Sequence, residues 1–76
     1  MDPMDLSKFV ASKSGKSVRE IGTSAGRSPA GFAPYIYKHN QPSLTVAALL
    51  CDVCGFDLLV RQRDTGEETI IDPPLM

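Results

Sequence analysis

The stretch Ser17–Cys54, SVREIGTSAGRSPAGFAPYIYKHNQPSLTVAALLCDVC, decides the fold. It begins with SVRE, a capping box in which Ser17 can accept from the amide of Glu20 and Glu20 can reach back to the amide of Ser17. Gly26 stands where a helix needs a residue with positive φ to stop, and a Ser-Pro step then offers the cap and first turn of a second helix. A short helix, a tight glycine turn and an immediate second helix predict a helix-turn-helix.

This stretch resembles the phage-repressor-like helix-turn-helix family, the Cro/lambda-repressor or XRE type. The family pattern joins a capped helix, a glycine turn and a second capped helix, and the matching positions are Ser17, Ile21, Gly22, Gly26, Ser28, Phe32 and Tyr35. It closes with a Pro-x-Leu start and a Leu-rich helix that ends in glycine, matched by Pro42, Leu44, Leu50 and Gly55. The resemblance implies a four-helix lambda-repressor-like domain that binds DNA.

The sequence as a whole predicts a mainly α fold with a small β part. We expect helices at about 3–13, 18–25, 29–37 and 44–54 within a helix-turn-helix domain of residues 1–56. Leu6, Phe9 and Val10 form the apolar stripe of the first helix. Pro34 would be about the sixth residue of the third helix, so we expect either a kink there or a helix that begins near Ala33.

The fourth expected helix is apolar nearly all round, so it must be covered nearly all round. One stripe, Leu44, Ala47, Leu50 and Cys54, should face the core. A second stripe on another face, Val46, Leu49 and Val53, needs cover from the C-terminal segment or from a second subunit. Cys51 and Cys54 form a C-x-x-C inside this helix, and because a zinc site needs four ligands we interpret them as buried structural cysteines.

Residues 57–72 change to a period of two around Asp64-Thr65-Gly66, which predicts a β-hairpin followed by a tail at 73–76. A lone two-stranded hairpin is marginal in water. It should therefore lie on the fourth helix, pair with the hairpin of a partner chain, or do both. A two-fold homodimer satisfies the second option, and its predicted interface residues are Val46, Leu49, Val53, Leu58, Val60 and Ile70.

Length and composition are those of one folded domain. With 76 residues, 42% of them hydrophobic and 22% charged, the chain is marginal alone and suited to a partner. It has no apolar run long enough to cross a membrane, and its two cysteines favour a reducing cytoplasm. The formal net charge of −1 hides an asymmetry: residues 1–43 carry six Lys and Arg against three Asp and Glu, whereas residues 44–76 carry two against six. The basic half is the helix-turn-helix half.

No catalytic pattern is present. The chain has one histidine, no glycine-rich phosphate loop, no Ser-His-Asp ordering and no plausible metal ligand set, so we expect a protein that is not an enzyme and that uses no cofactor or metal.

The leading hypothesis is a small homodimeric transcriptional regulator that binds double-stranded DNA through its second and third helices. Helix starts at Ser17 and Ser28 would meet phosphates, and Arg27 and the loop after the third helix would add charge. The predicted contact residues are Ser17, Arg19, Arg27, Ser28, Ala30, Gly31, Ala33, Pro34, Lys38, His39 and Asn40.

The third helix departs from the family in one respect. Its outward positions, Pro29, Ala30, Gly31, Ala33 and Pro34, have no polar side chain, so they can touch a thymine methyl but cannot form bidentate hydrogen bonds with base edges. The alternative hypothesis is therefore a protein-binding module on the same fold, such as an antitoxin-like partner or a phage-encoded inhibitor, that uses the apolar face of the third helix.

Overall fold

The helices of the computed structural model begin where the sequence supplies caps. The structure describes residues 1–28, 31–38 and 40–73. The Asp2 carboxylate accepts from the amide of Met4 at 2.9 Å, and Ser43 Oγ accepts from the amide of Val46 at 3.2 Å. The elements, in order, are η1 (Pro3–Asp5), α1 (Leu6–Ser14), α2 (Val18–Ser24), α3 (Ala33–Ile36), α4 (Leu44–Val53), β1 (Leu59–Arg61) and β2 (Glu68–Ile70).

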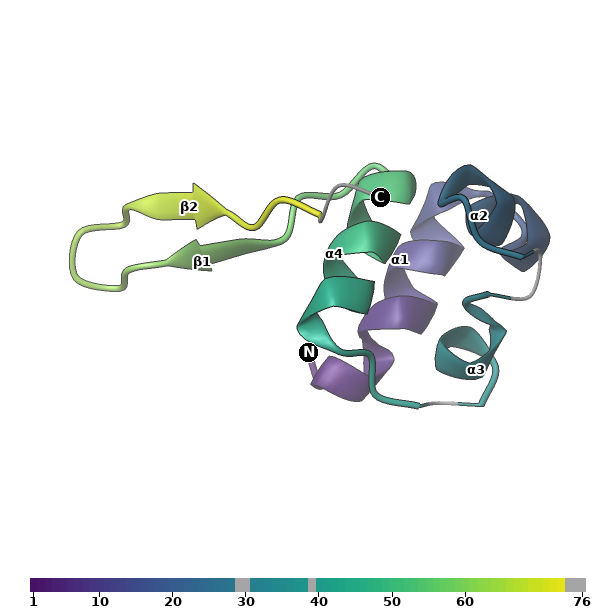
Figure 1. Ribbon diagram of the computed structural model, residues 1–76. Helices are drawn as coiled ribbons and strands as arrows, with labels where there is room; N and C mark the ends of the chain where they lie inside the picture. Colours follow the sequence, from purple (N-terminus) through teal and green to yellow (C-terminus); the bar gives the residue numbers. More distant parts are fainter. Residues whose placement is uncertain (29–30, 39, 74–76) are drawn as a thin grey trace.

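Four helices pack together at one end of the molecule, and a two-stranded hairpin extends from the other end (Figure 1). The chain is 40 Å long but only 26 by 21 Å across. The mainly helical fold with a small antiparallel hairpin is thereby confirmed. None of the described helices is long and apolar enough to span a bilayer.

Each helix contributes a side chain to one shared core. Val10 from α1, Ile21 from α2 and Leu50 from α4 are at most 1% exposed, and Phe32, directly before α3, is fully buried with them. Helix α1 contacts both α3 and α4, while α2 packs on α4. Burial of four large apolar side chains on one centre gives each helix a fixed place despite its short length.

The third helix is shorter than the range 29–37 expected from the sequence. It contains Ala33–Ile36 only, and Phe32 is its N-cap residue. Pro34 therefore lies in the first turn, where a missing amide hydrogen leaves no intrahelical bond unmade. The expected start near Ala33 is confirmed and the start after Ser28 is wrong, because the Ser28 carbonyl instead accepts from the Gly31 amide in a turn.

Two residues assigned to the core stripes lie nearer the surface. Phe9 is 40% exposed and meets Phe56 edge-on, with ring centroids 6.0 Å apart. Leu44 is 64% exposed at the first residue of α4. The buried part of α4 therefore begins at its third residue, Val46.

The chain itself covers the second stripe of α4. Val46 and Leu49 are each 7% exposed, and Phe56 and Leu58 pack against the same core from the base of the hairpin. Beyond that base the strands pair antiparallel, with Leu59 opposite Ile70 and Arg61 opposite Glu68, and all six strand residues are exposed. The hairpin therefore lies on α4 only at its base.

Candidate nucleic-acid interface

Helix α2 begins with the capping box read from the sequence. Ser17 Oγ accepts from the amide of Glu20 at 3.1 Å, and Glu20 Oε1 accepts from the amide of Ser17 at 3.3 Å. The box places a carboxylate on the positive end of the helix and occupies two of its amide donors. Arg19, exposed in the same turn, is therefore better placed than the backbone to meet a phosphate.

The turn after α2 is packed around Arg27. Gly26, at φ 72°, stops the helix, and the Arg27 amide then donates to the carbonyl of Gly22 at 2.9 Å. The guanidinium carbon of Arg27 lies 5.1 Å from the centroid of the Phe32 ring, a cation–π contact. Arg27 Nε is buried, and its N–H donates no hydrogen bond within the described part of the chain.

Gly31 is the residue that lets Arg27 lie there. A Cβ atom at position 31 would stand 2.7 Å from Arg27 Cβ and 3.1 Å from Arg27 Cδ. The Arg27 side chain therefore packs against the backbone at position 31, in space that any side chain there would occupy. This close approach fixes a half-buried cation between α2 and α3.

The first turn of α3 presents apolar surface. Ala33 and Pro34 are half-buried, and Tyr37, at the end of the helix, is 74% exposed. Lys38 and Asn40 are exposed in the loop that follows, and the Asn40 amide donates to the carbonyl of Pro34 at 3.2 Å. This bond holds the described part of the loop close to α3. Ala30 and His39, two of the expected contacts, lie outside the described residues.

The structure thus brings most of the predicted contact residues to one end of the molecule. Helices α2 and α3 lie away from the hairpin (Figure 1). The exposed predicted contacts in or next to these helices are Ser17, Arg19, Ser28, Lys38 and Asn40. Arg27 and Gly31 belong to the same end but are half-buried against each other.

A lysine outside the predicted site has a structural contact that the sequence does not signal. Lys16 Nζ donates to the carbonyl of Val53 at 3.1 Å, across 37 positions of sequence. This carbonyl is one of the orphan acceptors at the end of α4, so Lys16 complements the negative end of that helix. Only the packing of α1 and α4 side by side makes the contact possible.

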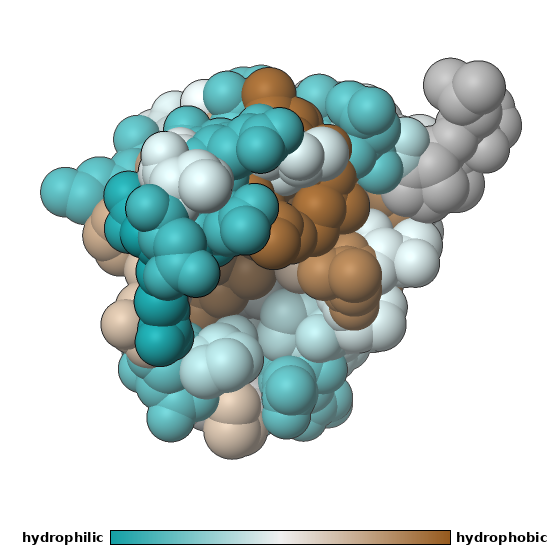
Figure 2. All heavy atoms as spheres, turned by 90° about the vertical axis from the view of Figure 1, so that its left-hand side faces the viewer, coloured by the Kyte–Doolittle hydropathy of each residue, from teal (hydrophilic) through white to brown (hydrophobic). Residues whose placement is uncertain are grey.

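The hairpin end has a different character. Figure 2 looks onto it and shows hydrophilic residues next to a hydrophobic patch. Val60 is 60% exposed, Ile70 51% and Leu59 40%. Of the predicted dimer-interface residues, Val60 and Ile70 are free to meet a partner, Val53 and Leu58 are half-buried, and Val46 and Leu49 are buried within the chain.

A shallow apolar groove of about 290 Å³ lies beside the base of the hairpin. Leu6 of α1, Leu44 and Ala47 of α4 and Leu58 before β1 line it. The exposed Leu44 is one of its walls. The groove and the exposed Leu59, Val60 and Ile70 give the hairpin end apolar surface.

Cys51 and Cys54 are buried, as interpreted from the sequence. Burial raises the pKa of both thiols, and the neighbouring Cys54 raises that of Cys51 further. Ser14 and Lys16 partly oppose the rise at Cys54. Neutral, buried thiols are poor nucleophiles, so these residues act as small core side chains.

Comparison of the chain with protein-family models, with curated proteins and with solved structures found no match.

Proposed function

We propose that the chain is a small DNA-binding protein of the helix-turn-helix type, acting as a homodimeric transcriptional regulator through α2 and α3. The observation that carries the proposal is the arrangement of cations around the turn between these helices. Arg19 is exposed on the capped first turn of α2, Arg27 is held in the turn, and Lys38 is exposed after α3. Helices α2 and α3, which carry or flank these cations, lie away from the hairpin (Figure 1), so a partner on the hairpin leaves this end free.

The binding would depend mainly on phosphate contacts. Arginine and lysine side chains that neutralise phosphates release condensed counterions, which makes affinity fall steeply as salt rises. The apolar first turn of α3, with Ala33 and Pro34, can contact thymine methyl groups but offers no hydrogen-bonding side chain to a base edge. Sequence preference would therefore come from methyl contacts and from the shape of the duplex.

The test is fluorescence anisotropy with a duplex from the upstream region of the protein's own gene and with a scrambled duplex. Each is titrated at about 50 mM and about 200 mM salt. Arg19→Ala and Lys38→Ala should weaken binding and reduce the salt slope by about one each. Arg63→Ala, which removes the same charge near the tip of the hairpin, is the matched control and should leave both quantities unchanged.

Each outcome has a clear meaning. Tight, salt-sensitive binding that prefers the upstream duplex supports a regulator. Equal loss of affinity in the Arg19, Lys38 and Arg63 variants would show non-specific attraction and contradict the proposed surface. Absence of binding to either duplex at low salt would overturn the proposal.

A protein-binding role on the same surface is the second candidate, and Tyr37 favours it. An aromatic side chain with 74% exposure beside the apolar first turn of α3 resembles an interface anchor. In that case Tyr37→Ser should abolish capture of the partner protein, whose binding would vary little with salt. Strong DNA binding that Tyr37→Ser leaves unchanged would argue against this role.

A further inference from the structure

Both edges of the hairpin carry backbone groups that need partners. The Ile71 amide donates to the Leu58 carbonyl at 2.7 Å, and the Gln62 amide donates to the Glu67 carbonyl at 2.8 Å. These bonds fix the alternation of the antiparallel ladder, so Leu59 and Arg61 turn their amide and carbonyl groups to the outer edge of β1. By the same rule Glu68 and Ile70 turn theirs to the outer edge of β2. An exposed strand edge of this kind is a template for another strand.

The two edges differ in charge pattern. Alternate residues share a face of the hairpin, so Asp57, Leu59 and Arg61 follow one another on one face of β1 and its approach. This order is acid, apolar, base, which is complementary to itself when reversed. On β2 and its exit the same face carries Glu68, Ile70 and Asp72, which is acid, apolar, acid.

We propose that a second copy of this chain pairs antiparallel along the outer edge of β1, with the two-fold axis at Leu59. Leu59 then stands opposite Leu59 of the second copy, and Arg61 stands opposite Asp57 of the second copy, twice by symmetry. The two hairpins form one four-stranded sheet. This inference rests on the homodimer in the proposed function and specifies the edge and the register of that dimer.

The outer edge of β2 cannot pair with its own copy in this way. Antiparallel self-pairing about Ile70 would place Glu68 opposite Asp72, and directly opposed like charges destabilise a sheet. Pairing of β1 with β2 of the next copy leaves free edges at both ends and extends without closing. Only self-pairing of β1 combines opposite charges with closure.

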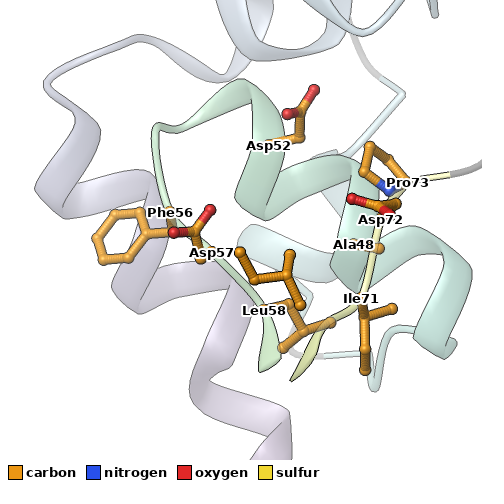
Figure 3. Close-up of a pocket in the computed structure, with 9 residues that line it drawn as sticks. Ala48, Asp52, Phe56, Asp57, Leu58, Ile71, Asp72 and Pro73 are labelled. Atoms are coloured by element: carbon orange, nitrogen blue, oxygen red, sulfur yellow. The ribbon is translucent and has the colours of Figure 1, made fainter. Parts of the chain in front are cut away.

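A pocket at the base of the hairpin receives the arginine. Asp52 from α4, Asp57 before β1 and Asp72 after β2 line it, and its volume is about 60 Å³ (Figure 3). Within the described part of the chain none of these three carboxylates has a salt-bridge or hydrogen-bond partner. Three carboxylates around one opening attract a cation. In the proposed register the cation is Arg61 of the second copy, which reaches Asp57 on the same face.

The same register covers part of the apolar surface that the hairpin leaves exposed. Leu59, 40% exposed, meets its symmetry copy on one face, and Ile70, 51% exposed, stays beside Leu59 of its own chain. On the other face Val60, 60% exposed, comes opposite Leu58 of the second copy, which lines the apolar groove. The lone hairpin, marginal by itself, becomes part of a four-stranded sheet.

The test uses charge reversal of the full chain and sedimentation equilibrium. Arg61→Asp and Asp57→Arg should each weaken self-association by about 10-fold or more, since two attractive pairs per dimer become repulsive. The double variant Asp57→Arg/Arg61→Asp should recover most of it. An equimolar mixture of the two single variants should also associate, because each variant carries the charges that the other lacks. Asp64→Arg, in the turn, is the matched control and should associate as the wild type does.

Recovery in the double variant and in the mixture would show that the charges act between chains. Every chain with Arg61→Asp still lacks the cross-strand Arg61–Glu68 pair, and a misfolded variant would not regain association in either experiment. A wild-type chain that stays monomeric at high concentration, single variants that associate normally, or an open-ended polymer would overturn the inference. The DNA titration is read separately. Dimers that bind no DNA would support the β1 pairing and contradict the proposed DNA-binding function. A chain that binds DNA but stays monomeric in solution would support DNA binding and contradict the β1 pairing.

Discussion

Replacement of Gly31 by alanine should destabilise the protein through Arg27. The new Cβ would stand 2.7 Å from Arg27 Cβ and 3.2 Å from the Ser28 carbonyl oxygen. Because Cβ is fixed to the backbone, the conflict cannot be relieved by moving the end of the arginine side chain alone. Overpacking of this kind costs about 1–3 kcal/mol. The lower backbone entropy of the unfolded chain with alanine offsets about 0.4–1 kcal/mol of that.

The net effect should be a loss of about 1–2 kcal/mol in the free energy of unfolding, which lowers Tm by roughly 5–15 °C for a chain of this size. Thermal unfolding followed by circular dichroism, at one fixed protein concentration, measures it. The same substitution in an Arg27→Gly background is the control, because that background lacks both arginine atoms that the new methyl would meet. Equal losses in the two backgrounds, or a Gly31→Ala protein as stable as the wild type, would refute the reasoning.

Three further substitutions have expected outcomes that can be measured by the same method. Ser7 is fully buried and its Oγ has no hydrogen-bond partner among the described residues, so Ser7→Ala should raise stability by about 1 kcal/mol, and a destabilised variant would contradict this. Lys16→Met removes the bond to the Val53 carbonyl and should lower Tm by a few degrees, less at high salt; a salt-independent loss would show that packing alone is responsible. Burial raises the pKa of the Cys51 thiol above the value of 9.0 expected for the unfolded chain, so the folded state keeps this proton to higher pH. The resulting stability is fully present below about pH 9 and falls above it, and Cys51→Ala should flatten that fall in urea titrations at about pH 8 and pH 10 under reducing conditions.

Much of the fold could be predicted from signals between residues that are close in sequence. The capping box at Ser17 and the stop at Gly26 each depend on residues within one turn of the chain, and both appear as expected. The hairpin turn is likewise local: Gly66 has φ 76°, and its amide donates to the Gln62 carbonyl at 2.8 Å. Such features can be read from sequence because their partners are sequence neighbours.

Features that depend on distant contacts could not be read in the same way. The sequence places Arg27 in the turn and Phe32 on the inward side of a helix at 29–37, and nothing in their spacing indicates that Phe32 would cap α3 and lie against the arginine. Val46 and Leu49 read as a second stripe that needs a partner, but Phe56 and Leu58 return to the core beside them. For the candidate site, sequence reasoning found the cations and the apolar first turn, while the close packing of Arg27 on Gly31 required coordinates.

The most direct test of the central idea, that one end of the molecule binds DNA while the other joins two copies, is the mass of the protein–DNA complex. Sedimentation velocity with a duplex of about three helical turns would measure it for the wild type and for Arg61→Asp. We expect two chains on each duplex for the wild type, and a lower apparent affinity with sequential binding for Arg61→Asp. One chain per duplex in both proteins at equal affinity, or no complex at all, would contradict the idea.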